Sequence, residues 1–254
     1  MTVTAARRAQ AVAALSSTAA IRALADELNA IGVPVLVLKG PLLQERLYGT
    51  PAAYPSCDVD VLVHPEHLHP VRRHLRATGW RFAAGNMLLW RLSRSAVFER
   101  GSVVLDLHWG IHAGNLPSTS LRRLERAMWS GASLGDHGLY EPAAAPLLVY
   151  VSVHGASHGF ERREWVEVVA RAAAQVEDWD DAWRTARRCR MEGTVRRALA
   201  VALDGRPPRP APLLDGWWGR LAGAASWTMR GHFLPRALRA TVARAVHRFH
   251  REPS

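Results

Sequence analysis

Apolar and polar residues change their spacing along this chain, from a helical period to a strand period and back. Residues 5–31 place apolar side chains at a helical spacing, which predicts an amphipathic helix. Short apolar runs bounded by glycine and proline follow at 33–40, 58–63 and 80–110, and such runs are typical of β-strands. From Thr119 to the end of the chain, helical patterns dominate.

Two shorter helices are predicted between these strands, over residues 41–48 and 65–79. The order of elements therefore predicts an α+β fold, in which an N-terminal helix and a small mixed sheet precede an all-helical C-terminal domain. We expect residues 1–140 to form the α/β core with its N-terminal helix, and residues 141–254 to form the helical domain. Neither a P-loop nor a G-x-G-x-x-G motif occurs, which argues against the common nucleotide-binding α/β folds.

Membrane and export signals are missing from the pattern. No apolar run reaches the ~18 residues that a membrane-spanning helix needs. Arg7, Arg8 and Arg22 interrupt the N-terminal helix, so we do not interpret it as a signal peptide. Cys57 and Cys189 are far apart and match no disulfide or metal-binding spacing. These features predict a cytoplasmic protein without a membrane segment.

The net charge of +11 is unevenly distributed along the chain. The first 181 residues hold equal numbers of acidic and basic side chains, so the whole excess lies in residues 182–254. A basic surface there would suit phosphates, nucleic acid or an acidic partner. The competing explanation is an arginine-rich composition, because Lys39 is the only lysine in the chain. Arginine count alone is therefore weak support for nucleic-acid binding.

Two aspartates interrupt the strand-like run at 58–63. Side chains alternate along a strand, so Asp58 and Asp60 share one face, with their Cα atoms about 7 Å apart. Like charges this close are unfavourable unless a cation lies between them. The pair alone is compatible with a solvated edge strand or with a divalent metal site. We expect replacement of either aspartate by asparagine to leave the fold intact or to stabilise it, because the repulsion is relieved.

A third aspartate favours the metal site. In the run at 103–112, Asp106 and His108 share one face of the predicted strand. Alone, Asp106 is equally compatible with a salt bridge or a turn. Three aspartates on neighbouring strands suit Mg²⁺, which takes oxygen ligands and is usually shared with substrate phosphates. Two such ions can hold the attacking and leaving oxygens during displacement at phosphorus.

Four ordered motifs resemble a known family. They are L-K-G at 38–40, D-x-D-x-L-V at 58–63, D-L-H-W at 106–109 and H-G-x-x-H-G at 154–159. Together they look like the bacterial nucleotidyltransferase-like family of the polymerase β superfamily, whose members usually have no assigned substrate. The resemblance runs from about Val33 to about Ala174.

The resemblance implies transfer of a nucleoside monophosphate from an NTP with Mg²⁺ or Mn²⁺. It implies that Asp58, Asp60 and Asp106 bind the metal and are catalytic, and that Asp106 helps to deprotonate an acceptor hydroxyl. It further implies that Gly40 lets the backbone approach the nucleotide phosphates and that Lys39 contacts them.

Two positions depart from the family pattern. Pro41 stands where a serine is usual in the superfamily, and Tyr54 stands where an arginine is common. Both departures leave room for a changed substrate or weakened activity. Arg46 is the candidate replacement for the missing phosphate contact, and His108 is expected either to orient Asp106 or to contact the substrate.

Histidines and tryptophans outside this set are expected to pack rather than to react. His154 and His158 lie four residues apart on a predicted helix and share a face, but no third zinc ligand accompanies them. We expect them to pack or hydrogen-bond between the α/β and helical parts. Trp109 and Trp165 are expected in the core.

The favoured function is metal-dependent transfer of a nucleoside monophosphate to a hydroxyl or phosphate of a small-molecule or peptide acceptor, as in natural-product or antibiotic modification. The alternatives are transfer to RNA or protein, such as a tRNA or a toxin, and a catalytically weakened nucleic-acid-binding protein. Three retained aspartates argue against weakened catalysis. The arginines of 186–197 and of the predicted helix at 234–254 either contact an anionic acceptor or are merely solvated.

Overall fold

The computed structural model describes residues 3–56, 58–83, 94–113 and 116–204, and every structural statement below refers to these residues. The chain divides into two compact units, of which the first comprises Met1–His112 and Pro117–Pro208. All helices and strands named below belong to that first unit. The strand-like run at residues 86–93 and the predicted helix at 234–254 lie outside the described residues.

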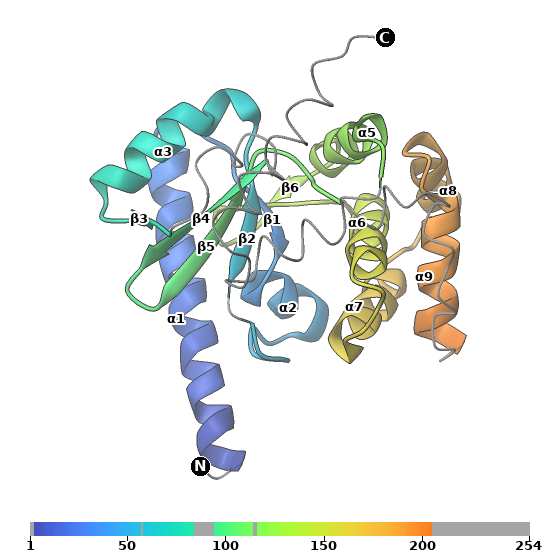
Figure 1. Ribbon diagram of the computed structural model, residues 1–254, viewed down its shortest axis with the longest axis horizontal. Helices are drawn as coiled ribbons and strands as arrows, with labels where there is room; N and C mark the ends of the chain where they lie inside the picture. The colour runs from blue at the N-terminus through green and yellow to red at the C-terminus, as the bar shows by residue number, and fades with distance from the viewer. Residues whose placement is uncertain (1–2, 57, 84–93, 114–115, 205–254) are drawn as a thin grey trace, which may run out of the picture. The chain divides into compact units, whose positions relative to one another are not determined.

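Helix α1 (Val3–Asn29) confirms the long N-terminal helix, two residues earlier at each end than the pattern indicated. Its apolar stripe is buried at Ile21, Leu24 and Leu28. The stripe packs on α2 (Pro41–Tyr48) and on strand β5 (Val103–His108), so α1 covers part of the sheet (Figure 1). Burial of this stripe, rather than helix propensity, is what holds such a helix in place.

A mixed sheet of seven strands forms the centre of the described residues, in the order β3-β4-β5-β2-β1-β7-β6. The remaining strands are β1 (Leu36–Lys39), β2 (Val59–Leu62), β3 (Arg81–Phe82), β4 (Ser95–Arg100), β6 (Ser133–Leu134) and β7 (Tyr140–Glu141). Strand β2 runs antiparallel to β1 and parallel to β5, and β4 and β5 form an antiparallel pair. The predicted mixed sheet is thereby confirmed.

Strand β2 lies between β1 and β5 and is buried on both faces. Val59 and Leu62 have no exposed surface, and Asp60 is only 1% exposed. The solvated edge strand, one of the two explanations for the aspartate pair, is therefore wrong. A carboxylate on a central strand needs partners, because burial of an unpaired charge is costly.

Strands β6 and β7 were not expected from the sequence pattern, which indicated helices after Thr119. Each has only two residues, too few to show an alternating pattern. They exist because they pair with each other, and because Tyr140 of β7 pairs with Leu36 of β1. Tertiary pairing therefore decides the structure of this segment.

Within the described residues, four helices follow the last strand, as predicted: α6 (Ala144–Ser157), α7 (Arg163–Ala174), α8 (Trp179–Arg188) and α9 (Glu192–Asp204). Earlier in the chain, η1 (Pro65–His67) and α3 (Leu68–Ala77) lie between β2 and β3, and α5 (Ser118–Trp129) lies between β5 and β6. Helix α6 is buried along almost its whole length and packs against α5, α7, α8 and α9 (Figure 1). It is the central helix of this group, and it also contributes to the wall of the site described next.

Among the described helices, none combines the length and the apolar character that crossing a membrane requires.

Candidate active site

Three adjacent strands bring four ionisable side chains together. Asp60 of β2 lies directly opposite Asp106 of the parallel strand β5, and His108 follows two residues later on the same face of β5. Lys39 ends β1 and pairs with Asp60 in the sheet register. An irregularity between Val37 and Lys39 shifts that register, and the shift aligns Lys39 with Asp60.

The side chains of this group, which we name the carboxylate cluster (Lys39, Asp60, Asp106 and His108), are in direct contact. Lys39 Nζ lies 2.9 Å from Asp60 Oδ1. His108 Nε2 lies 3.0 Å from the same oxygen and 3.3 Å from Asp106 Oδ2. The sequence placed the two aspartates on one face correctly, but it contained no signal that Lys39 contacts one of them.

Three polar atoms of the cluster have no hydrogen-bond partner within the described part of the chain. They are Asp60 Oδ2, Asp106 Oδ1 and His108 Nδ1, and all three are buried. Buried polar atoms are almost always satisfied in native proteins, so an orphaned carboxylate oxygen indicates a missing water or ion. Ligand atoms of Asp60, Asp106 and His108 lie within 4.8 Å of one another, which is compatible with a shared cation.

The charges of the cluster balance one another. Burial alone would raise the pKa of Asp60, but the charges of Lys39 and His108 hold it well below its usual range. Burial likewise opposes ionisation of Asp106, whose pKa is nevertheless lowered by His108. Burial would lower the pKa of His108, but the two carboxylates raise it to about 9. At neutral pH two negative and two positive charges are therefore present.

This balance corrects the expectation that repulsion between carboxylates dominates the site. For Asp60 the nearest charges are positive, and its carboxylate is almost fully buried. Removal of that carboxylate would leave Lys39 and His108 without their shared partner. Substitution of Asp60 is therefore expected to destabilise the protein rather than to stabilise it.

Asp58 and Gly40 lie next to each other at the N-terminal end of β2. Asp58 immediately precedes the strand and is half-buried, and its backbone carbonyl accepts a hydrogen bond from Ser56 Oγ at 3.0 Å. Gly40 has a φ angle of 89°. A Cβ atom there would lie 2.8 Å from the Asp58 carbonyl oxygen and 3.1 Å from Val59 Cα. The chain's own backbone therefore already requires glycine between β1 and α2.

The family model described as "uncharacterised nucleotidyltransferase" matches residues 1–204. The chain belongs to this nucleotidyltransferase family. No curated protein matches the chain significantly.

Solved structures of ANT(2'')-Ia resemble the chain. A solution structure of this antibiotic-resistance factor is 10% identical, with a TM-score of 0.48, and the match covers 72% of this chain and 95% of that one. A crystal structure of ANT(2'')-Ia in complex with adenylyl-2''-tobramycin is also 10% identical, with a TM-score of 0.47 and coverage of 69% and 97%.

The nucleotidyltransferase family implies a divalent metal, and the residues of the cluster fit one. The two carboxylates come from hydrogen-bonded strands, and each has a buried oxygen atom without a partner among the described residues. Carboxylate oxygens are the preferred protein ligands of Mg²⁺ and Mn²⁺. The side chains that would hold the ion are therefore in place.

Arg46 of α2 has structural partners in this nucleotidyltransferase. It donates hydrogen bonds to the Pro142 carbonyl at 2.8 Å and to Gln175 Oε1 at 3.1 Å, and it lies 3.5 Å from a carboxylate oxygen of Glu141. These contacts connect α2 with β7 and with the end of α7. Within the described residues, its contacts are with this junction rather than with the carboxylate cluster.

Tyr150 of α6 is a wall residue that sequence reasoning missed. Its side chain is buried, and burial raises the pKa of its phenol above the ordinary value, while the charge of Lys39 opposes the rise. The phenol also interacts electrostatically with Asp60 and Asp106. The available signal was its position four residues before His154 in the H-G-x-x-H-G helix, which places both side chains on one face.

The two histidines of that motif pack, as expected, but the rings that they contact among the described residues belong to α6 and α7 rather than to the α/β part. The rings of His154 and His158 lie 4.8 Å apart, and His158 stacks on Trp165 with ring centroids 4.5 Å apart. Trp165 is half-buried rather than part of the core, whereas Trp109 is buried as predicted. These rings connect α6 with the beginning of α7.

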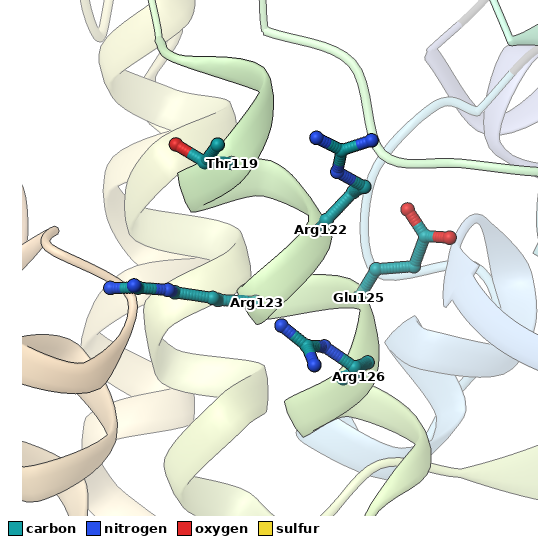
Figure 2. Close-up of a pocket in the computed structure, with 5 residues that line it drawn as sticks. All are labelled: Thr119, Arg122, Arg123, Glu125 and Arg126. Atoms are coloured by element: carbon teal, nitrogen blue, oxygen red, sulfur yellow. The ribbon is translucent and has the colours of Figure 1, made fainter.

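A second feature lies along α5. A hollow of about 490 Å³ is lined by Thr119, Arg122, Arg123, Glu125 and Arg126. Figure 2 shows Arg123 and Glu125 pointing to opposite sides of the helix. A second hollow of about 660 Å³ shares Arg123 and Arg126 and includes Arg188 of α8. Neither has a lining residue in common with the carboxylate cluster, so the protein has a basic region separate from its acidic one.

Proposed function

We propose that the protein is a divalent-metal-dependent nucleotidyltransferase, which transfers a nucleoside monophosphate from an NTP to a hydroxyl or phosphate of a small-molecule or peptide acceptor. The observation that carries this proposal is the carboxylate cluster, in which two adjacent strands hold buried carboxylate oxygens without a partner in the described part of the chain. Membership of a nucleotidyltransferase family supports the reaction class.

In this proposal each side chain has a defined task. Asp60 and Asp106, with Asp58 at the N-terminal end of β2, hold Mg²⁺ or Mn²⁺. A bound ion of this kind supplies charge stabilisation for displacement at phosphorus. Asp106 is 15% exposed, so a hydroxyl can approach it, and it accepts the proton of the acceptor. Lys39 is 27% exposed and offers its remaining N–H donors to the phosphates of the NTP.

We assign different tasks to the two predicted domains. Residues 1–140 carry the metal and the triphosphate, and the helical residues from 141 onward contribute the wall that faces the acceptor. Tyr150 supports this division, because it lies on α6 and interacts with charges of the cluster. Gly40 acts by holding the turn between β1 and α2 against Asp58.

We further propose that the acceptor carries negative charge, and that its charged part binds the basic region, away from the group that reacts at the carboxylate cluster. Arg123, Arg126 and Arg188 line one hollow together with Asp181, and none of the three arginines has a carboxylate partner among the described residues. Arginine binds phosphate and carboxylate through paired donors. An anionic acceptor should then bind less well as salt rises from ~0.05 to ~0.2 M, and steeply so if it is a nucleic acid.

Transfer to RNA or protein, and nucleic-acid binding without catalysis, are the competing functions. Incubation with Mn²⁺ or Mg²⁺, each labelled NTP and panels of acceptors separates them. Pyrophosphate release with a mass increase of one nucleoside monophosphate on a small molecule or peptide supports the proposal. The same increase on RNA or protein supports the first alternative. RNA binding without pyrophosphate release, in the presence of either metal, would reject the enzymatic proposal.

A further inference from the structure

The imidazole of His108 lies between the carboxylates of Asp60 and Asp106 and contacts both of them. A single ring nitrogen, Nε2, contacts both Asp60 at 3.0 Å and Asp106 at 3.3 Å. The side chain is only 13% exposed, so it has little freedom to turn into solvent. The nitrogen therefore occupies the space into which both carboxylates point.

The donor atoms are held by regular structure. Asp106 and His108 are two residues apart on β5 and so share a face, and Asp60 is paired with Asp106 across the parallel ladder. Side chains on hydrogen-bonded central strands move less than side chains on loops. An ion that binds Asp60 and Asp106 would thus meet the imidazole without rearrangement of the backbone, and it would displace the Nε2 proton to solvent so that the nitrogen lone pair becomes available.

The second ring nitrogen of His108, Nδ1, does not hold the ring to any other group of the described residues. Metal-binding histidines usually donate their other N–H to a carboxylate or carbonyl group, which fixes the tautomer. Here Nδ1 is buried and has no hydrogen-bond partner within the described residues. Among the described residues, the two carboxylates are therefore the hydrogen-bond partners that orient the ring. Nε2, which points at them, is the nitrogen that would face a bound ion.

We propose that His108 Nε2 is a metal ligand together with Asp60 and Asp106, and that this mixed nitrogen and oxygen set makes the site selective for transition-metal ions over Mg²⁺. The proposal rests on the metal-dependent function proposed above and deepens it. Mg²⁺ prefers oxygen ligands and water, whereas imidazole suits first-row transition ions. Transition ions bind most sites more tightly than Mg²⁺ in any case. The role of the imidazole is therefore measured by how much the affinity for each ion changes when His108 is replaced.

The test compares wild-type protein with His108→Gln and His108→Ala by calorimetric titration with Mg²⁺, Mn²⁺ and Co²⁺. Glutamine keeps a polar partner for the carboxylates, so that variant remains informative if alanine prevents folding. We expect Co²⁺ affinity to fall at least tenfold and Mg²⁺ affinity to change much less. His74→Gln removes an imidazole that pairs with Glu27 on the helical surface, and it should change neither affinity.

Pulsed electron paramagnetic resonance of the Mn²⁺ complex gives a readout independent of activity. A directly bound imidazole produces coupling to ¹⁴N, which should be present in the wild type and lost in His108→Gln. If Mn²⁺ binds without that coupling, or if both variants lose Mg²⁺ and Co²⁺ affinity equally, His108 is not a selective ligand, although the metal site itself stands. If the wild type binds none of the three ions, the proposed metal-dependent function fails together with this inference.

Discussion

Asp60 has to satisfy two requirements that conflict at the level of a single residue. It needs cationic partners to be buried at 1% exposure, and it must keep an oxygen free if it is to bind an ion. Lys39 and His108 share Oδ1, which leaves Oδ2 without a partner among the described residues. The carboxylate is therefore anchored through one oxygen and available through the other.

Asp60→Ala should destabilise the metal-free protein by up to about 3 kcal/mol, because it leaves two partly buried cations, Lys39 at 27% and His108 at 13% exposure, without their shared partner. Urea unfolding in EDTA measures this change. Asp58→Ala removes a half-buried carboxylate outside the cluster and serves as the matched control, with a smaller expected loss. Equal stabilities of wild type and Asp60→Ala would show that the ion pairs do not contribute to folding.

Gly40→Ala should cost more stability than Gly32→Ala. Both glycines have positive φ angles, of 89° and 72°, so alanine is strained at either position, and the ψ of −163° at Gly40 lies in a region almost restricted to glycine, where the cost is about 1–3 kcal/mol. Only at Gly40 would the new Cβ meet backbone atoms, whereas nothing lies within 4 Å at Gly32. The collision should add about 1–3 kcal/mol. Thermal or urea unfolding of the two variants isolates this difference, and matching losses would refute the close approach.

Sequence reasoning reached Asp60 and Asp106 because alternation along a strand is a local rule. It did not reach the contact between Lys39 and Asp60, because that contact depends on a register shift between two strands. The family resemblance singled out Gly40 for an approach of the backbone to phosphates, whereas the structure gives a local reason for glycine there, because the backbone of Asp58 and Val59 lies against it. Alternation along a strand therefore identifies which residues share a face. The contacts that those residues make depend on how the strands pair, which the local pattern does not contain.

At the scale of elements, β7 is a junction that the sequence did not reveal. Its Glu141 contacts both His137 and Arg46, at 2.8 and 3.5 Å, and Arg46 connects onward to Gln175. Two residues that pair with a sheet edge leave no periodic pattern, whereas amphipathic helices such as α3 and α7 do. This difference explains why helices were predicted well and short strands were not.

Stability should depend on pH through Glu141. Its pKa is lowered by the hydrogen bond from His137, against an opposing effect of burial, and Arg46 lowers it further. A lowered carboxyl pKa contributes stability that is present above the ordinary value and is lost as the pH falls through the folded-state value. Glu141→Gln should thus be less stable than wild type at pH ~7 and approach it near pH ~3.

Chemical unfolding at both pH values measures this difference, and Glu192→Gln, in an exposed pair with Arg196, is the control. A difference between wild type and Glu141→Gln that stays constant from pH ~7 to ~3 would contradict the role assigned to this carboxylate.

For the molecule as a whole, the charge balance of the cluster predicts that metal is not required for folding. In EDTA the protein should keep its helical circular dichroism and unfold cooperatively on heating. Added Mn²⁺ should raise the melting temperature with concentration, because it binds the folded state. Asp106→Asn should reduce that shift. Loss of helical signal on chelation would show that the cluster needs an ion to form.

The internal pairing of Asp60 with Lys39 and His108 has a consequence for the life of the protein in a cell. Many small metalloproteins fold only when their ion arrives, so synthesis and loading are one event. Here the counter-charges are encoded in the chain, and a newly made molecule can mature while free metal is scarce. If the protein binds a divalent ion as proposed, loading is a later and reversible step that folded apoprotein can await. The supply of metal, rather than the rate of translation, would then set how much of the protein is competent at any moment.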